Sequence, residues 1–343
     1  MNNVKHILIS RTDNIGDVIL TLPMAGILKH YFPDVKITFL GREYVRAITD
    51  HCAYIDDFLD WDLLSQMKES DAVTKIKSYA FDAAIHVFPK KQIGILMKKA
   101  KVPYRIGPSS RFYYWMTCNK RVYFSRKKSD LHEAQLNLNL LKPFNIELNN
   151  DLKYLREMTG FSCKEPLPSH LQSVLAPNKF NLIIHPFTNG HTREWSVSHF
   201  IQLINELPVE KFNIIITGSK KENEIIQEKI MPHCSHAINF AGKCSLNEFI
   251  QFIAHADGLI ANSTGPMHIA AVLGIHTLGL FPITKGIDIN RWAPLGEKAE
   301  VITANANCQK PTCVAVNDCF CMESITVEQV KNVIVRWGEN LGR

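Results

Sequence analysis

Residues 4–17 read VKHILISRTDNIGD, and this stretch indicates the fold of the first half of the chain. Val4 to Ser10 is an apolar run typical of a buried strand, and Arg11 to Asp17 is a polar turn. Apolar residues with helical spacing follow from Asp17 to Tyr31, and Val35 to Leu40 has the pattern of the next strand. This strand–helix–strand order predicts a parallel α/β sheet.

The alternation of strands and helices continues to residue 144 and begins again after residue 178. Between these points, Glu165 to Asn178 is polar and contains Pro166, Pro168 and Pro177, which is typical of a linker. Further strands are predicted at 81–88, 102–106, 180–185, 212–217, 258–261 and 277–281. Further helices are predicted at 93–100, 137–144, 198–207, 222–230, 246–254, 266–273 and 327–341.

This pattern predicts two doubly wound, Rossmann-like α/β domains that face a central cleft. They are expected at residues 1–165 and 179–325, with a linker at 166–178. The closing segment, 326–343, is expected to be helical and to have the option of packing back on the N-terminal domain. In such sheets ligands bind at the carboxyl ends of the strands. Functional residues are therefore expected in the polar segments that follow the strands.

The composition agrees with a folded two-domain chain and limits its function. The chain has 343 residues, of which 46% are hydrophobic, enough for two cores. A net charge of +6 is too small to argue for nucleic acid, and no DNA- or RNA-binding motif is found. The first residues lack the regions of a signal peptide, and no apolar run is long enough to span a bilayer. A cytoplasmic location is therefore expected.

The positive charge is unevenly distributed. Between Ala83 and Ser129 the sequence has twelve Lys and Arg residues and no Asp or Glu. A stretch of one sign attracts an anionic partner, although Lys and Arg also occur as ordinary solvated residues. The candidates for binding an anionic acceptor are Lys90, Lys91, Lys98, Arg105, Arg111 and Arg121, together with Gly16 in the turn after the first strand.

The turn after the first strand carries the candidate catalytic carboxylates. Asp17 stands where a helix begins, so it either takes a proton from an acceptor hydroxyl or caps the helix amides. A helix N-terminus is expected to lower the pKa of Asp17, and Asp13 is the second candidate base. The turn contains neither a G-x-G-x-x-G fingerprint nor a Walker loop.

Two segments of the second domain are candidates for binding a phosphate group. Residues 185–195 read HPFTNGHTREW, and Thr188, Thr192 and Arg193 offer donors there, although Asn-Gly is also typical of an ordinary turn. Residues 261–271 read ANSTGPMHIAA and place Pro266 in the first turn of a helix. The free amides and the helix dipole predict a diphosphate site, in which His268 is either a participant or a structural histidine.

Together these segments resemble glycosyltransferase family 9, the ADP-heptose:lipopolysaccharide heptosyltransferases. The matching pieces are RTDNIGD at 11–17 with Pro23, the 185–195 loop with Phe200, GKCSL at 242–246 and STGPMH at 263–268. Each piece is short, but they occur in the family's order and span most of the chain. The resemblance implies a GT-B fold. It also implies inverting transfer of a heptose from ADP-heptose to the lipopolysaccharide inner core, without a metal ion or other cofactor.

The resemblance also implies roles for single residues. Asp17 matches the proposed catalytic base, and Glu222 lies near the ribose-contacting glutamate, with Glu224 as the alternative. The other implied donor contacts are Thr188 and Arg193 at a phosphate, Lys243, Cys244 and Ser245 beside the base, and Thr264, Gly265 and Met267 at the diphosphate. Thr192, Ser263, Pro266 and His268 lie in the same segments and complete the donor-binding candidates.

One position departs from the family pattern. Many members have an Asp, thought to contact the sugar, where this chain has Ser263. The departure weakens the case for heptose more than the case for sugar transfer. The alternatives are a family 9-type transferase using another nucleotide sugar, a GT-B-like sugar-nucleotide epimerase, a nucleic-acid-binding protein and an inactive binding protein.

The acceptor implied by the resemblance is an anionic glycolipid, a lipopolysaccharide precursor, at the cytoplasmic face of the inner membrane. Tyr113, Tyr114 and Trp115 lie among the basic residues and are expected to help the protein touch that membrane surface. Near the end of the chain, the spacing of four cysteines differs from that of paired zinc ligands, so no metal site is predicted. These cysteines are Cys308, Cys313, Cys319 and Cys321.

Overall fold

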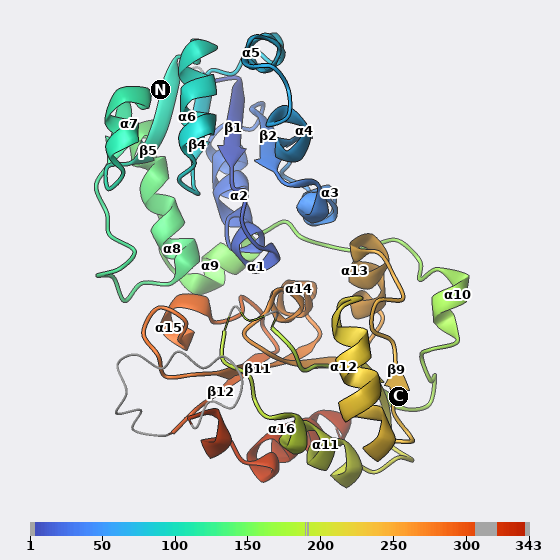
Figure 1. The fold of residues 1–343 in the computed structure, drawn as a ribbon. Coiled ribbons are helices and arrows are strands. Elements are labelled where there is room, and N and C mark those ends of the chain that lie inside the picture. Colours follow the sequence, from blue (N-terminus) through green and yellow to red (C-terminus); the bar gives the residue numbers. More distant parts are fainter. Residues whose placement is uncertain (1–3, 189, 191, 306–320, 340–343) are drawn as a thin grey trace. The chain divides into compact units, whose positions relative to one another are not determined.

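The computed structural model describes residues 4–188, 190, 192–305 and 321–339 (Figure 1). The chain divides into two compact units, Met1–Ser162 and Cys163–Arg343. Each unit is built on a six-stranded parallel sheet flanked by helices. The predicted strand–helix alternation therefore corresponds to two separate α/β units.

The N-terminal sheet has the strand order β3-β2-β1-β4-β5-β6. Its central strand β1 pairs in parallel on both sides, so that Ile7 lies opposite Ile37 of β2 and Ala83 of β4. The chain order reverses between β1 and β4, which is where doubly wound sheets open a crevice at their carboxyl edge. The strands are β1 (His6–Ser10), β2 (Lys36–Gly41), β3 (Asp57–Asp60), β4 (Ala83–His86), β5 (Tyr104–Pro108) and β6 (Lys120–Val122).

The first helix is shorter than the sequence pattern predicts. The predicted helix from Asp17 to Tyr31 is divided into α1 (Ile15–Ile19) and α2 (Leu22–Tyr31). Pro23 lies in the first turn of α2, where its missing N–H costs no hydrogen bond, and a proline there cannot continue a preceding helix. The remaining helical segments of this unit are η1 (Glu43–Val45), α3 (Arg46–Asp50), α4 (Trp61–Leu64), α5 (Glu69–Ser78), α6 (Lys91–Lys99), α7 (Phe112–Thr117), α8 (Glu133–Leu138), η2 (Asn139–Phe144) and α9 (Leu152–Glu157).

The C-terminal sheet repeats the same topology. Its order is β12-β11-β10-β7-β8-β9, so the chain reverses between β7 and β10 as it does between β1 and β4. Within it, β10 pairs in parallel with β7 and β11. The strands are β7 (Phe180–His185), β8 (Phe212–Ile216), β9 (Ile238–Asn239), β10 (Gly258–Asn262), β11 (His276–Phe281) and β12 (Ala299–Thr303).

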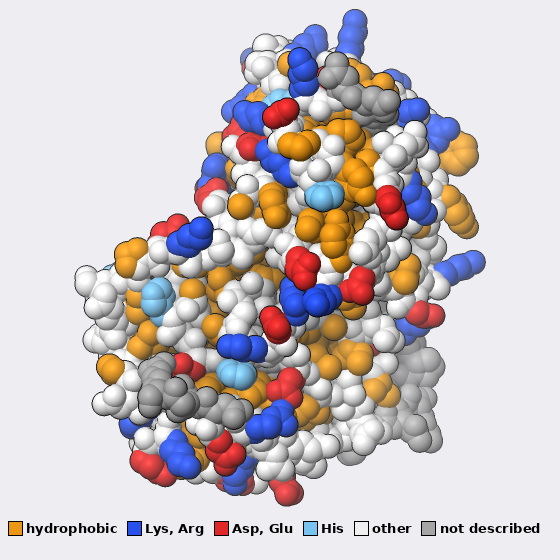
Figure 2. Space-filling model, turned by 180° about the vertical axis from the view of Figure 1, so that it is seen from behind, with side chains coloured by type: hydrophobic (Ala, Val, Ile, Leu, Met, Phe, Trp, Pro, Cys, Tyr) orange, Lys and Arg blue, Asp and Glu red, His pale blue; other side chains and the backbone are white. Residues whose placement is uncertain are grey.

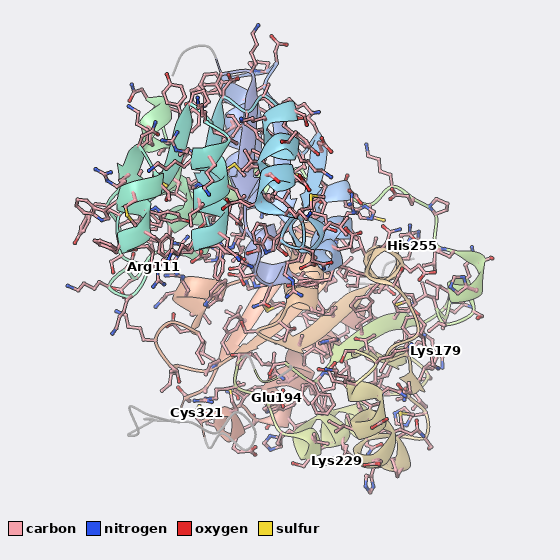
Figure 3. The ribbon with its side chains drawn as sticks, turned by 45° about the horizontal axis from the view of Figure 1, so that its top comes forward. Arg111, Lys179, Glu194, Lys229, His255 and Cys321 are labelled. Atoms are coloured by element: carbon pink, nitrogen blue, oxygen red, sulfur yellow. The ribbon has the colours of Figure 1, made fainter. Side chains whose placement is uncertain are left out.

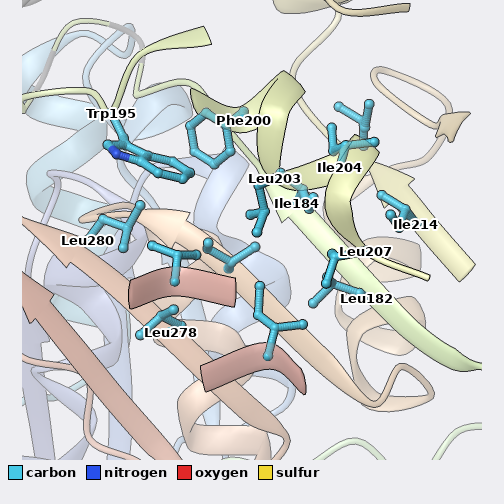
Figure 4. Close-up of a cluster of buried hydrophobic side chains, with 14 of the residues drawn as sticks. Leu182, Ile184, Trp195, Phe200, Leu203, Ile204, Leu207, Ile214, Leu278 and Leu280 are labelled. Carbon is cyan, nitrogen blue, oxygen red and sulfur yellow. The ribbon is translucent and has the colours of Figure 1, made fainter. Parts of the chain in front are cut away.

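The last helix of the described chain completes the core of its own unit. Val330, Ile334 and Trp337 of α16 (Val327–Glu339) are buried in one cluster with residues of β7 and α11. Figure 4 labels the β7 and α11 members of this cluster. The sequence was compatible with packing of this helix against the N-terminal domain. The structure buries its apolar face within the C-terminal unit. The other helical segments of this unit are α10 (Ser169–Gln172), α11 (Val197–Glu206), α12 (Glu222–Lys229), η3 (Met231–His233), α13 (Leu246–Ala254), α14 (Gly265–Leu273), α15 (Ile289–Trp292) and η4 (Met322–Ser324).

Four strands were missed by the sequence pattern, and they lie toward the sheet edges: β3, β6, β9 and β12. They are short or carry charged residues, so an apolar period is absent. Cys308, Cys313 and Cys319 lie outside the described residues, while Cys321 is buried. In the part of the chain that is described, no helix has both the length and the apolar character needed to cross a membrane.

Candidate active site

Polar side chains gather where β1 ends, on the turn that leads into α1. Arg11, which is 3% exposed, lies at the centre and donates from Nε to Asp13 (2.8 Å) and from Nη2 to both Asp13 (3.1 Å) and Asp17. Both carboxylate oxygens of Asp13 therefore accept hydrogen bonds from the Arg11 guanidinium, whereas Asp17 accepts through one oxygen. The Asp17 carboxyl also lies within hydrogen-bonding reach of the Asp13 carboxyl, so that the two acids and Arg11 form one cluster.

Two residues of α8 extend this cluster from a distant part of the chain. Glu133 is 1% exposed and accepts from Arg11 Nη1 at 2.9 Å and from Arg126 Nε at 3.1 Å. Asn137 accepts from both guanidiniums and donates to the carbonyl of Leu20 at 3.1 Å, where α1 gives way to α2. Arg11, Glu133 and Asn137 were given no role in the sequence analysis. No local pattern connects α8 to the first turn.

Burial and the neighbouring charges of this cluster set the pKa of the Asp17 carboxyl. Burial raises the pKa of the Asp17 carboxyl to about 7; Arg11 opposes this, while the carboxylates of Asp13 and Glu133 add to it. The expected lowering of this pKa by the helix N-terminus is therefore wrong, because desolvation outweighs it. Asp17 is also not the helix cap, since α1 begins after Asn14. Gly16 is buried within α1.

The basic residues predicted to bind an acceptor do not form one group. Lys90 and Lys91 stand at the start of α6, and the Lys90 ammonium lies 4.8 Å from the centre of the Trp61 ring. Lys98 lies near the other end of that helix, roughly 10 Å along its axis from Lys91. Arg105 donates to the backbone carbonyls of Thr117 (2.7 Å) and Val102, so its guanidinium is engaged within the fold.

Arg111 and Arg121 lie farther from Asp17. Arg121 is in β6, three strands from β1 and so roughly 14 Å across the sheet, and Arg111 directly precedes α7 (Figure 3). The shared basic stretch predicts one acceptor site for Arg111, Arg121 and Lys90. The fold instead distributes that stretch over the carboxyl edge, the far end of α6 and the outer strand.

In the C-terminal unit the loop after β7 is tied down by neutral bonds and one carboxylate. Asn262, which is fully buried at the end of β10, accepts from the Trp195 N–H at 2.9 Å and donates to the Pro186 carbonyl at 2.7 Å. Glu194 accepts from both the N–H (2.7 Å) and the hydroxyl (2.8 Å) of Thr188 (Figure 3). Asn262 and Glu194 are positioning residues that no sequence pattern predicted.

The same loop presents candidate donor groups. Thr188 and Arg193 are buried, and the Thr188 hydroxyl is already engaged by Glu194. The Thr192 hydroxyl is also buried and has no hydrogen-bond partner among the described residues. A buried polar group of this kind favours a ligand or a water molecule. The loop therefore holds one hydroxyl, that of Thr192, ready for a further contact.

The helix that follows β10 begins at the next polar segment. Thr264 precedes α14 without capping it through its side chain, since its hydroxyl donates to the Asn262 carbonyl at 3.1 Å. Pro266 lies in the first turn, as predicted. Met267 is fully buried against β11, where a Cβ on Gly279 would lie 2.6 Å from its sulfur, so only its backbone remains for an anion. Ser263, Thr264, Gly265 and Pro266 are half-buried, and His268 is buried.

A pocket opens beside the ends of β8 and α13. It is lined by apolar and small residues with two hydroxyls: Thr217, Gly218, Phe240, Gly242, Cys244, Ser245, Leu246 and Phe249. Of the three residues predicted to border the base, Cys244 and Ser245 line this pocket and Lys243 does not. Burial raises the pKa of the Cys244 thiol to about 11, so it is uncharged. Ser245 also caps α13 in a reciprocal pair with Glu248.

Glu222 lies at the start of α12, close to this pocket. One carboxylate oxygen accepts from the Ser219 N–H at 2.6 Å, and a Cβ on the pocket residue Gly218 would lie 3.1 Å from that oxygen. The other oxygen is buried and has no hydrogen-bond partner among the described residues. Such an oxygen can accept a bond from a ligand hydroxyl.

Known proteins resemble this chain over most of its length. It is 27% identical over 310 residues to a protein of Haemophilus influenzae named as a candidate glycosyltransferase, covering 86% of this chain and 87% of the relative. It is 24% identical over 321 residues to the lipopolysaccharide core heptosyltransferase OpsX of the same organism, covering 89% of this chain and 86% of the relative.

The fold also matches that of a solved structure over nearly the whole chain. The ADP-heptose lipopolysaccharide heptosyltransferase II of Escherichia coli superposes with a TM-score of 0.74 at 16% identity, covering 98% of both chains. The two parallel sheets are thus those of a GT-B fold. The model of glycosyltransferase family 9 (heptosyltransferase) matches residues 72–318, well over half of the chain. The chain belongs to glycosyltransferase family 9 and is a glycosyltransferase.

Proposed function

We propose that this protein transfers a heptose from ADP-L-glycero-D-manno-heptose to the inner core of lipopolysaccharide, with inversion and without a metal ion. The observation that carries the proposal is the Asp17 carboxyl in the first turn of α1, which pairs with Arg11 and has a pKa raised to about 7 by burial. Family membership supplies the reaction class, and the names of the relatives supply the sugar and the acceptor.

In the proposed reaction Asp17 is the general base. It accepts the proton of an acceptor hydroxyl as that oxygen forms a bond to the anomeric carbon of the sugar. The bond between this carbon and the diphosphate breaks on the opposite face, which inverts the configuration, and the nucleoside diphosphate leaves. The proton on Asp17 then passes to solvent. A carboxyl with a pKa near 7 is suited to this role because it is partly ionised at neutral pH and binds the proton firmly.

The C-terminal unit is proposed to bind the donor. The amides at the start of α14, the Thr192 hydroxyl and the Arg193 guanidinium would stabilise the charge that develops on the diphosphate. The pocket bounded by Phe240 and Phe249 would take the nucleotide base, and the unpartnered oxygen of Glu222 would accept from a ribose hydroxyl. These groups can stabilise the leaving diphosphate without a divalent cation.

Ser263 favours a second candidate, transfer of a different sugar by the same site. It is half-buried between the end of β10 and the start of α14, where many family members have an Asp. A serine hydroxyl can donate as well as accept, whereas a carboxylate only accepts. The hydroxyl pattern of the preferred sugar would therefore differ at this point.

A transfer assay with purified acceptor and a panel of ADP-, UDP- and GDP-sugars, run with EDTA, tests the proposal. We expect transfer from ADP-heptose, and a loss of kcat of about 10²–10⁴-fold in Asp17→Asn. Donor affinity, measured by thermal shift with ADP, should be unchanged because Asp17 lies in the other unit.

Asp13→Asn is the matched control, because Asp13 shares Arg11 but has both oxygens engaged. A larger loss of kcat in Asp13→Asn than in Asp17→Asn would move the base to Asp13. Transfer from another nucleotide sugar would retain the reaction class and replace the heptose. Interconversion of a nucleotide sugar without acceptor, as an epimerase would catalyse, would contradict the proposal.

A further inference from the structure

Helix α7 exposes its large hydrophobic side chains instead of burying them. Phe112, Trp115 and Met116 are 80%, 59% and 55% exposed, at the spacing that places them on one helix face. Tyr123, just after β6, is 86% exposed. These are four of the five most exposed large hydrophobic side chains in the described chain. Such a concentration on a surface marks an interaction site.

The opposite side of α7 is fixed in the core, so this exposure cannot be relieved by rotating the helix. Tyr114 is fully buried, and its hydroxyl accepts from the Lys90 N–H at 3.2 Å. Its ring packs so closely that a Cβ on Gly94 or Gly107 would lie 3.2 or 3.1 Å from it. The expectation that Tyr114 touches a membrane is therefore wrong, and the outward face consists of other residues.

Hydrogen bonds fix one of the exposed residues, Trp115, to Ser109 before α7 and to Arg121 of β6. The Trp115 indole donates to the Ser109 carbonyl at 3.1 Å, and the Arg121 guanidinium stacks 4.8 Å above the indole. Arg121 also donates to the carbonyls of Trp115 and Cys118, each at 3.4 Å. The exposed face is thus a pre-formed platform made by α7 and β6.

The charged residues of the segment that forms this platform have one sign. Arg111, Lys120 and Arg121 are exposed beside it, and residues 83–129 contain no Asp or Glu. Figure 2 shows hydrophobic side chains projecting from the edge of the N-terminal unit near Lys and Arg side chains. Aromatic rings with adjacent cations suit the interface of an anionic bilayer, where the rings lie at headgroup level and the cations meet lipid phosphates.

We propose that the α7 platform, defined by Phe112, Trp115, Met116 and Tyr123 with Arg111, Lys120 and Arg121, binds the surface of an anionic lipid bilayer. The partner rests on the proposed function, since a lipid-borne acceptor lies at such a surface. The rings would enter the interface while the described chain stays outside the bilayer. This contact would bring the enzyme to its acceptor and lies apart from the Asp17 turn, three strands away across the sheet.

Co-sedimentation of the full chain with vesicles, without donor or acceptor, tests this surface. We expect binding to vesicles of phosphatidylglycerol and phosphatidylethanolamine, weak binding to phosphatidylcholine, and release by salt. Phe112→Ser with Trp115→Ser should weaken binding on the order of tenfold or more. Lys120→Gln should weaken it about fivefold. The matched control is Leu63→Ser with Met67→Ser, two exposed hydrophobic residues elsewhere in this unit, and it should bind like the wild type.

Two further measurements keep this proposal separate from the proposed function. The Phe112→Ser, Trp115→Ser variant should still unfold cooperatively at a temperature close to that of the wild type, because it loses only the surface contacts of Trp115 with Ser109 and Arg121 and leaves the buried Tyr114 in place. Its transfer to an acceptor fragment without acyl chains should also be unchanged. Wild-type vesicle binding without any transfer would instead sink the proposed function and leave the surface in place.

Three results would overturn the surface itself. One is wild-type binding to neither kind of vesicle. Another is equal binding by the wild type and the double variant. The third is a wild-type dimer, seen by analytical ultracentrifugation, that the double variant abolishes without any vesicle binding, since a second copy would then cover the platform.

Discussion

The polar segments after β1 and after β7 occupy equivalent positions in two sheets of the same strand order, yet they are held by different bonds. After β1, Arg11 joins three carboxylates in a buried charge cluster. After β7, the loop is held by Asn262 through backbone groups and by Glu194 through Thr188. The first arrangement adjusts the proton affinity of a carboxyl, whereas the second fixes a loop and leaves hydroxyl and amide donors for a ligand.

The difference suits the two tasks of a glycosyl transfer. A base needs a raised pKa, and burial among other carboxylates supplies it. A diphosphate site needs donors in a fixed place, and the Asn262 bonds to backbone groups together with the Glu194 bonds to Thr188 fix this loop. The following predictions break one arrangement or the other and are ordered by the expected size of the effect.

Removing the Arg11 guanidinium should cause the largest loss of stability. Arg11→Met leaves buried carboxylates without their partner, and we expect a loss of about 3–5 kcal/mol in the free energy of unfolding by urea. Arg42→Met is the control, because its ion pair with Asp62 is exposed and should be worth at most about 1 kcal/mol. Equal losses in both variants would show that burial does not strengthen the cluster.

The pH dependence of transfer should report the Asp17 carboxyl. With a pKa of about 7, the ionised base becomes scarcer below neutrality, so kcat/KM should fall about 50-fold from pH 7 to pH 5, with a slope that approaches tenfold per pH unit. Glu133→Gln removes one neighbouring carboxylate and should shift the profile to lower pH. A profile that stays flat to pH 5 would exclude Asp17 as the base.

The raised pKa of Asp17 should also make the free energy of unfolding decrease as pH rises. The folded state holds the Asp17 proton more tightly than the unfolded chain, whose carboxyl titrates near pH 4. The contribution of Asp17 is therefore fully present below pH 4 and is lost as pH rises from about 4 to about 7. In Asp17→Asn, the free energy of unfolding by urea should depend less on pH between about pH 4 and pH 7. The same pH dependence as in the wild type would contradict the raised pKa of Asp17.

Breaking the tether of the second loop should have an intermediate effect. Asn262→Ala leaves the Trp195 N–H and the Pro186 carbonyl without their partner, at an expected cost of about 1–3 kcal/mol in the free energy of unfolding. The KM for the donor should rise while the pH profile keeps its midpoint. A shifted midpoint would mean that the two arrangements are coupled.

The smallest expected effect separates a helix cap from a donor contact. Ser245→Ala removes the cap of α13 and should cost about 1 kcal/mol in the free energy of unfolding. If capping is its whole role, the KM for the donor should hardly change. A rise in KM without loss of stability would assign Ser245 to the nucleotide pocket that it lines.

The sequence predicted the central strands well because they are buried on both sides and read as apolar runs, as in β1 and β7. It failed at β6 and β9, which are too short to show a period. It also located the polar segments after β1, β7 and β10 correctly, since their order along the chain is a local property. The roles of single residues in them, Asp17 included, remain predictions.

By itself the sequence determined the two alternating halves, the segments at the strand ends and the basic stretch. Tertiary structure alone brought Glu133 to Arg11 across 122 positions, raised the pKa of Asp17 by burial, and turned Tyr114 inward while leaving Trp115 outside. The physical reason is how far apart along the chain the interacting residues lie. Strand and turn patterns depend on neighbours along the chain, whereas desolvation and charge pairing depend on whichever distant residues the packed fold brings into contact.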